Sequence, residues 1–127
     1  MKKYLADTNI FLRLFLNDNK KQAKIAENYL SQAKTGKIKI ILLPEIVFEI
    51  NYVLEKVYFL KKTEIIKFLS SLVKTPYLEV LNLNILLKTI TLYEKEKIDL
   101  IDAYIFSFAE EENAKILSFD EDFKKLK

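Results

Sequence analysis

The chain has 127 residues, enough for one domain of ordinary size, and 50% of them are hydrophobic, which excludes a disordered chain. It contains no cysteine and no histidine, so disulfides, thiolate metal sites and histidine catalysis are excluded, and any bound metal must have oxygen ligands. The formal charge of +3 comes from scattered lysines and the single arginine, Arg13, and it permits a polyanionic partner without requiring one.

Short apolar runs, which predict strands, alternate along the chain with segments of helical periodicity. In chain order we expect a strand at residues 4–6, helices at 10–15 and 19–34, a strand at 37–43, helices at 44–57 and 61–74, a strand at 77–83, helices at 85–97 and 99–113, a strand at 115–119 and a short turn or helix at 120–126. Gly36 fits the C-cap of the second helix, and Pro44 fits the first turn of the third.

This alternation predicts a parallel sheet with helices on both faces. We therefore expect one domain over residues 1–127, an α/β fold built as a three-layer α/β/α sandwich with a central parallel sheet of four to five strands. The most apolar run, residues 38–43, is too short to span a bilayer, and no signal peptide is visible. A cytoplasmic protein is expected.

Two acids stand at the carboxyl ends of expected strands, which is where the sites of such folds lie. Asp7 follows the strand at residues 4–6, and Asp120 follows the strand at 115–119. Either acid can be explained as a helix N-cap, because its side chain can accept a backbone N–H of the first turn. Capping is the simpler interpretation of Asp7 alone. The same arrangement of a strand followed by an acid recurs at Asp120, and this recurrence weakens the capping interpretation.

Two further acids lie on expected helices. Glu49 falls at the border of the expected buried stripe of its helix, with Asn51 on the far side and no lysine three or four residues later. Glu45, one turn earlier, is explained by the helix dipole. Asp99 is the natural N-cap of the last long helix, and Asp102 lies in its first turn. The residues alone leave a structural and a functional interpretation of Glu49 and Asp102 equally open.

Taken together, the acids indicate more than any one of them does. If Asp7, Glu49, Asp102 and Asp120 converge, about four negative charges share one site, and they require raised pKa values or bound cations. With no histidine and one arginine in the chain, Mg²⁺ or Mn²⁺ is the natural counter-charge. Metal ions held by carboxylates are a standard device for phosphodiester hydrolysis, because they activate water and stabilise the leaving oxygen.

Three segments resemble the PIN domain, in particular the VapC-type toxins of bacterial and archaeal toxin–antitoxin pairs. They are ADTNIFLRLFL, PEIVFEINYVL and IDLIDAYIFSFAEEENAKILSFDEDFKKL, which occur in this order with family-like spacing and cover nearly the whole chain. The resemblance implies a Mg²⁺- or Mn²⁺-dependent endoribonuclease. The metal-binding and catalytic acids that it implies are Asp7, Glu49, Asp102 and Asp120. The supporting residues that it implies are Thr8, Asn9, Asp99, Ser118 and Asp122. Asn113-Ala114 departs from the family, since many relatives carry glycine there.

The resemblance also implies partners, namely an RNA substrate, a cognate antitoxin bound across a groove of apolar helices, and a second copy in a homodimer. The apolar residues over 52–73 that would suit such a groove are explained equally well by packing on the sheet. One alternative is a catalytically silent PIN-like interaction module. Another is a receiver-type signalling domain, which would need paired acids near the first strand. The RNA target and the number of metal ions stay open.

Overall fold

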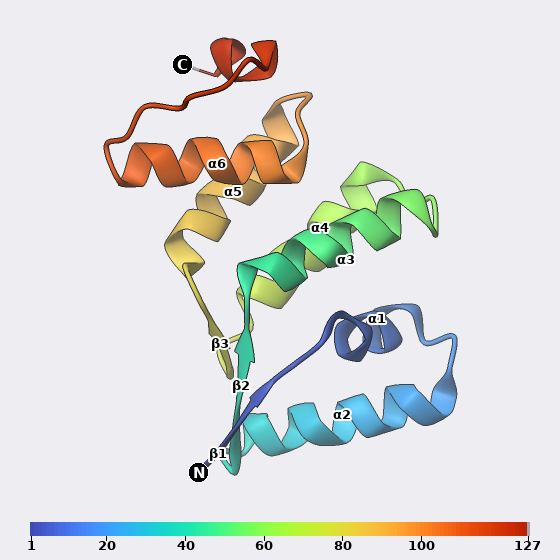
Figure 1. Ribbon diagram of the computed structural model, residues 1–127. Coiled ribbons are helices and arrows are strands. Elements are labelled where there is room, and N and C mark those ends of the chain that lie inside the picture. The colour runs from blue at the N-terminus through green and yellow to red at the C-terminus, as the bar shows by residue number, and fades with distance from the viewer. Residues whose placement is uncertain (127) are drawn as a thin grey trace. The chain divides into compact units, whose positions relative to one another are not determined.

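The computed structural model describes residues 1–126 (Figure 1). Contacts divide the chain into two compact units, residues 1–81 and the part that begins at Asn82. The described residues form six α-helices, one 3-10 helix and one parallel sheet, which confirms the α/β class. They contain three strands, so the expected count of four to five is not reached. The three-layer arrangement and the single domain over residues 1–127 stay predictions.

The sheet belongs to the first unit and has the order β1-β2-β3. Its strands are β1 (Lys2–Leu5), β2 (Ile38–Leu42) and β3 (Leu78–Val80), and both pairs are parallel. In the central strand, Ile38, Ile40 and Leu42 are buried at every second position, as expected for side chains that alternate between faces. Because the strands are parallel, their carboxyl ends share one edge, and Asp7 comes directly after β1 at that edge.

Two helices follow β1 and two follow β2. They are α1 (Thr8–Leu16), α2 (Lys20–Lys34), α3 (Pro44–Lys56) and α4 (Lys62–Val73). The small side chains of Ala23, Ala26 and Ala33 are buried, which lets α2 approach β2 closely. Gly36 follows α2 with a φ of +83°, a left-handed conformation that glycine adopts without strain.

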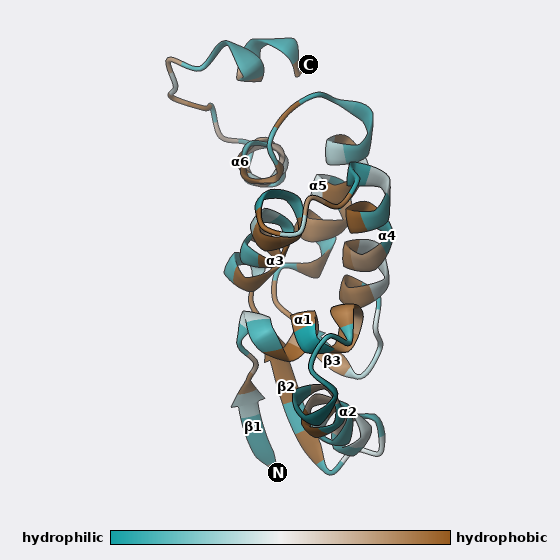
Figure 2. Cartoon of the chain, turned by 90° about the vertical axis from the view of Figure 1, so that its right-hand side faces the viewer, coloured by the Kyte–Doolittle hydropathy of each residue, from teal (hydrophilic) through white to brown (hydrophobic). Residues whose placement is uncertain are grey.

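The register of α3 differs from the expectation. Its buried positions include Val47, Ile50 and Leu54, as a helix of this periodicity requires, but Asn51 is also buried, with 8% of its surface exposed. The prediction that Asn51 lies on the far side is therefore wrong, and Glu49 is exposed rather than at the border. The buried stripe is therefore turned toward Asn51 and away from Glu49, on a helix that contacts both α1 and α4. Figure 2 shows the apolar and polar sides of α3 in brown and teal.

The second unit is built on two packed helices, α5 (Leu83–Lys95) and α6 (Leu100–Glu111). Leu86, Leu100 and Ala103 are buried, and Ala103 is small enough to let the helices pack closely. An ion pair of 2.9 Å between Lys88 and Glu111 joins the first half of α5 to the end of α6. A 3-10 helix, η1 (Glu121–Lys125), follows an extended stretch and ends the described chain.

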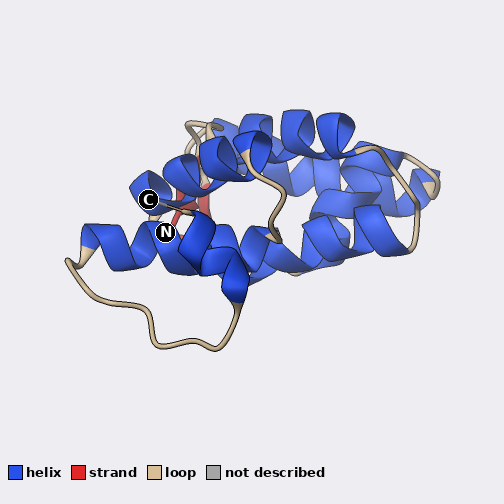
Figure 3. Cartoon of the chain, turned by 90° about the horizontal axis from the view of Figure 1, so that it is seen from above, coloured by secondary structure: helices blue, strands red, loops and turns tan. Residues whose placement is uncertain are grey.

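The strand expected at residues 115–119 does not form, so this prediction is wrong. The segment is extended, but no described strand pairs with it, and Figure 3 shows it as a loop between α6 and η1. Leu117 and Phe119 are fully exposed. The composition of the segment favours a strand, yet a strand also requires a neighbour whose backbone N–H and C=O groups can pair with its own.

The α-helices are short. Their lengths run from 9 residues in α1 to 15 residues in α2. At about 1.5 Å per residue, even α2 is shorter than the roughly 30 Å hydrocarbon core of a bilayer. Within residues 1–126, no helix combines the length and the apolar character that crossing a membrane requires.

Candidate metal centre

The first group of acids lies where β1 leads into α1. Asp7 has an extended backbone and occupies the N-cap of α1, where its Oδ1 atom accepts a hydrogen bond of 2.7 Å from the backbone N–H of Thr8. The capping interpretation of Asp7 is therefore right. It accounts for one carboxylate oxygen only, because Oδ2 has no hydrogen-bond partner among the described residues, and the side chain is exposed.

Thr8 connects Asp7 to an acid that lies 41 residues away from Thr8 in the sequence. The backbone N–H of Thr8 binds Asp7, and its side-chain hydroxyl donates a hydrogen bond to Oε1 of Glu49 on α3. Thr8 itself is buried, with 5% of its surface exposed, so this residue is fixed by packing. Asp7 and Glu49 are thus brought together in the first unit. Glu45 is exposed in the first turn of α3, and Asn9 is exposed in the first turn of α1.

The second group of acids lies in the second unit. Asp102 comes from the first turn of α6, and Asp120 and Asp122 come from the start of η1. One carboxylate oxygen from each of these three residues lies within 4.8 Å of the other two. Asp102 and Asp122 are half-buried and Asp120 is exposed, so the group is open to solvent on one side.

Local hydrogen bonds explain why Asp120 and Asp122 are held at this turn. The Oδ1 atom of Asp120 accepts a hydrogen bond of 2.9 Å from the backbone N–H of Asp122, which caps η1. The hydroxyl oxygen of Ser118 accepts a hydrogen bond of 2.9 Å from the backbone N–H of Asp120. Asp99 occupies the N-cap position of α6 with an extended backbone, but its side chain makes no capping hydrogen bond.

The charges of this group act on Asp102. Burial raises the pKa of the Asp102 carboxyl, and the negative charges of Asp120, Asp99 and Asp122 raise this pKa further. A divalent cation among the oxygens would offset these effects. The donor set also suits Mg²⁺ or Mn²⁺, since Mg²⁺–oxygen distances of about 2.1 Å place opposite ligands about 4 Å apart. Asp102, Asp120 and Asp122 would hold such an ion.

Comparison with models of known protein families assigns the chain to one of them. The sequence model of the PIN domain matches residues 4–127. The chain belongs to the PIN domain family. PIN domains are generally nuclease domains, commonly dependent on a metal ion, and they typically use divalent metals. No curated protein matches the chain significantly.

The four acids expected to form the PIN site fall into two groups. Asp7 and Glu49 are joined through Thr8 in the first unit, and Asp102 and Asp120 lie together in the second unit. Asp122 was expected only in a supporting role, whereas one of its carboxylate oxygens lies within 4.8 Å of oxygens of both Asp102 and Asp120. The signal for Asp122 was its spacing of two residues from Asp120 in a tight turn, where the capping bond draws both acids together.

Proposed function

We propose that this PIN domain is a metal-dependent endoribonuclease that hydrolyses RNA phosphodiester bonds. Asp7, Glu49, Asp102 and Asp120 are the proposed metal-binding and catalytic acids, and Mg²⁺ or Mn²⁺ is the proposed metal. The observation that carries the proposal is the group of three carboxylate oxygens from Asp102, Asp120 and Asp122 within 4.8 Å, in a chain of a nuclease family. The raised pKa of Asp102 supports it, because a cation would relieve the repulsion that raises this pKa.

The surroundings of each proposed site acid suggest its part in binding the metal ion. The bound ion would supply an activated water and stabilise charge on the leaving oxygen. Asp102 and Asp120 would hold the ion from α6 and from the start of η1, and Asp122 would add a third carboxylate. Asp7 and Glu49, which Thr8 links in the first unit, are proposed as metal ligands on the resemblance of their segments to the family. Scattered lysines would bind the RNA phosphates.

We further propose the role of a VapC-type toxin with a cognate antitoxin and a homodimeric state. The resemblance of the three sequence segments to such toxins supports this role. The exposed apolar side chains of Tyr52, Val57 and Phe59, in α3 and directly after it, are available to a partner protein. Co-purification with the product of a small reading frame next to the gene tests the antitoxin, and size-exclusion chromatography with light scattering tests the dimer.

The direct test of the nuclease is cleavage of labelled RNA in buffers with Mg²⁺, with Mn²⁺ or with EDTA. The wild-type protein should cleave in the metal buffers only. Asp7→Asn and Asp102→Asn should each reduce the rate at least a hundredfold, because each removes a charged ligand. Glu27→Gln is the control, since it removes one charge from an exposed position on α2 and should cleave like the wild type.

The outcomes separate the candidate functions. Undiminished cleavage by both aspartate variants would refute the proposed site. A wild-type protein that neither cleaves RNA nor binds millimolar Mg²⁺ or Mn²⁺ in calorimetry would instead be the silent interaction module. The PIN family match argues against the receiver-type alternative.

A further inference from the structure

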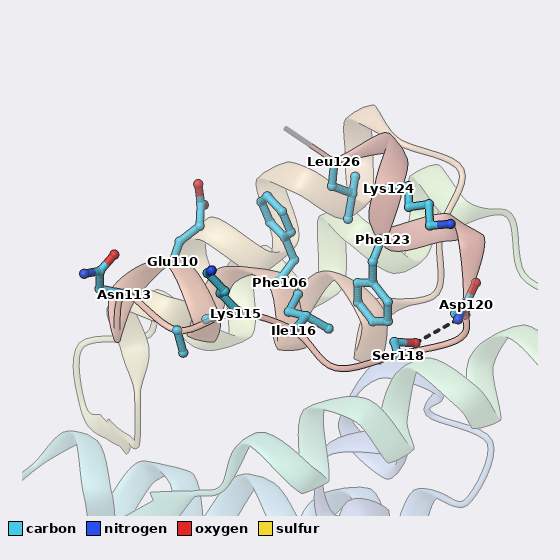
Figure 4. Close-up of a pocket in the computed structure, with 12 residues that line it drawn as sticks. Phe106, Glu110, Asn113, Lys115, Ile116, Ser118, Asp120, Phe123, Lys124 and Leu126 are labelled. Atoms are coloured by element: carbon cyan, nitrogen blue, oxygen red, sulfur yellow. Dashed lines mark hydrogen bonds between the residues drawn. The ribbon is translucent and has the colours of Figure 1, made fainter.

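A cavity of about 640 Å³ lies within the second unit, next to the acids of that unit. About half of its lining residues are apolar, and the side chains of Phe106, Ile116, Phe123 and Leu126 point into the space between α6 and η1 (Figure 4). Its volume falls in the range of small-molecule and cofactor sites, roughly 300–1,000 Å³. Apolar walls with two aromatic rings fit a flat, unsaturated ring system better than an extended aliphatic chain.

The cavity is continuous with the acid group through Asp120. This residue lines the cavity and also contributes one of the three carboxylates that lie within 4.8 Å of each other. Figure 4 shows Asp120 and Ser118 together at one end of the cavity, joined by their hydrogen bond. A molecule that fills the cavity would therefore have one end beside the proposed metal ligands.

Two lysines line the cavity, and the acids Glu110 and Asp120 line it as well, so its charged side chains balance in number. The lysines are Lys115 and Lys124. Lys124 makes an exposed ion pair of 3.1 Å with Glu121, which is weak at this exposure. Lys115 makes no ion pair with any residue in the range 1–126 and is exposed. Cations beside aromatic walls are the combination by which proteins bind single-stranded nucleic acid, through its phosphates and its bases.

We propose that this cavity holds one nucleotide of a single-stranded RNA, the nucleotide next to the phosphate that is cleaved. Its base stacks on the ring of Phe123 or Phe106, its phosphates lie near Lys115 and Lys124, and its position beside Asp120 places the neighbouring phosphodiester at the metal. The inference rests on the proposed nuclease function and adds to it the part of the protein that selects the substrate strand.

The test measures binding separately from cleavage. Fluorescence anisotropy follows a labelled single-stranded RNA in a buffer with Ca²⁺, which also takes carboxylate ligands, and a gel verifies that the RNA stays intact. Phe123→Leu keeps an apolar side chain but removes the stacking surface, and it should weaken binding about fivefold or more. Lys115→Gln should weaken binding, and it should reduce the slope of log affinity against log salt concentration by about one. Lys97→Gln, an exposed lysine outside the cavity, should bind within twofold of the wild type.

Far-UV circular dichroism and thermal unfolding confirm that each variant is folded. If Phe123→Leu fails to fold, the RNA affinity of Lys115→Gln tests the proposal by itself. Lys115→Arg should bind RNA like the wild type because it keeps the positive charge. Wild-type affinity in both Phe123→Leu and Lys115→Gln overturns the proposal, as does a wild-type protein that does not bind the RNA. If the wild type cleaves RNA while these variants bind normally, the cavity assignment fails and the nuclease stands. If binding depends on the cavity but no metal supports cleavage, the nuclease fails and the cavity assignment stands.

Discussion

Thr8 is a buried hydroxyl residue that hydrogen-bonds two acids at once. We predict that Thr8→Val lowers RNA cleavage about tenfold and costs about 1 kcal/mol of unfolding free energy, because Glu49 loses the donor that orients it. Thr8→Ser keeps the hydroxyl and should recover most of the activity. Initial rates and denaturant titrations of the three proteins check this. A Thr8→Val protein with full activity would show that the hydrogen bond only serves stability.

We expect the Asp102 carboxylate to destabilise the folded protein when no metal is bound. Its pKa is raised in the folded state, so the folded state binds its proton more readily than the unfolded state does. The folded state therefore loses stability as the pH rises from the ordinary aspartate pKa of about 3.9 through the raised value, and the loss is complete above it. We predict that Asp102→Asn raises the Tm in EDTA at pH 7 and leaves it nearly unchanged near pH 3.

Thermal unfolding of both proteins at the two pH values measures this effect, and added Mg²⁺ should narrow the gap at pH 7 by stabilising the wild type. An Asp102→Asn protein that melts below the wild type in EDTA at pH 7 would contradict the prediction. Such a result would mean that Asp102 has a stabilising partner in the folded protein.

At the scale of elements, α2 begins with a cap whose contribution can be measured. The side-chain oxygen of Asn19 accepts a hydrogen bond of 3.0 Å from the backbone N–H of Gln22. We predict that Asn19→Ala costs about 1 kcal/mol and lowers the Tm by about 2–8 °C, whereas Asn19→Asp, which also caps, stays close to the wild type. Calorimetry of the two variants checks this. Equal melting temperatures would show that packing of the alanine face holds the start of α2 without its cap.

The elements that could be predicted from the sequence are those with local sequence signals. The helices were expected near their observed positions because periodicity, Gly36 and Pro44 are local signals. β2 was equally clear, since it lies in the most apolar run of the chain, residues 38–43. The segment at 115–119 has strand-like residues but forms no ladder, and a single sequence does not report whether a neighbouring strand is present.

At the scale of the whole molecule, the charge predicts how RNA binding depends on salt. The chain has 21 basic and 18 acidic residues, and its basic residues are scattered rather than gathered in one block. If about three phosphates are contacted, affinity for single-stranded RNA should fall about tenfold or more between 50 and 200 mM salt. Anisotropy titrations at several salt concentrations measure the slope. Affinity that does not change with salt would exclude a phosphate-based mode of binding.

The type of ligand in the candidate site could be predicted from the sequence, but which acids lie together could be predicted only in part. Without cysteine and histidine, only carboxylates remain as strong metal ligands, so the candidate acids could be named from the sequence. The contribution of Asp122 depends on the turn that Asp120 caps, and the link from Thr8 to Glu49 depends on the packing of α1 on α3. Of the two, only the link from Thr8 to Glu49 is a three-dimensional fact that the spacing of residues does not encode.

We expect the extended stretch before η1 to be sensitive to proteases. Leu117 and Phe119 are fully exposed in a segment without backbone pairing, which is the form of chain that proteases cut. A chymotrypsin-type cut after Phe119 would leave Asp102 on one fragment and Asp120 and Asp122 on the other. A divalent ion bound by all three would hold the fragments together and slow the cut. Limited proteolysis with and without Mn²⁺ would therefore test whether these three acids bind the ion.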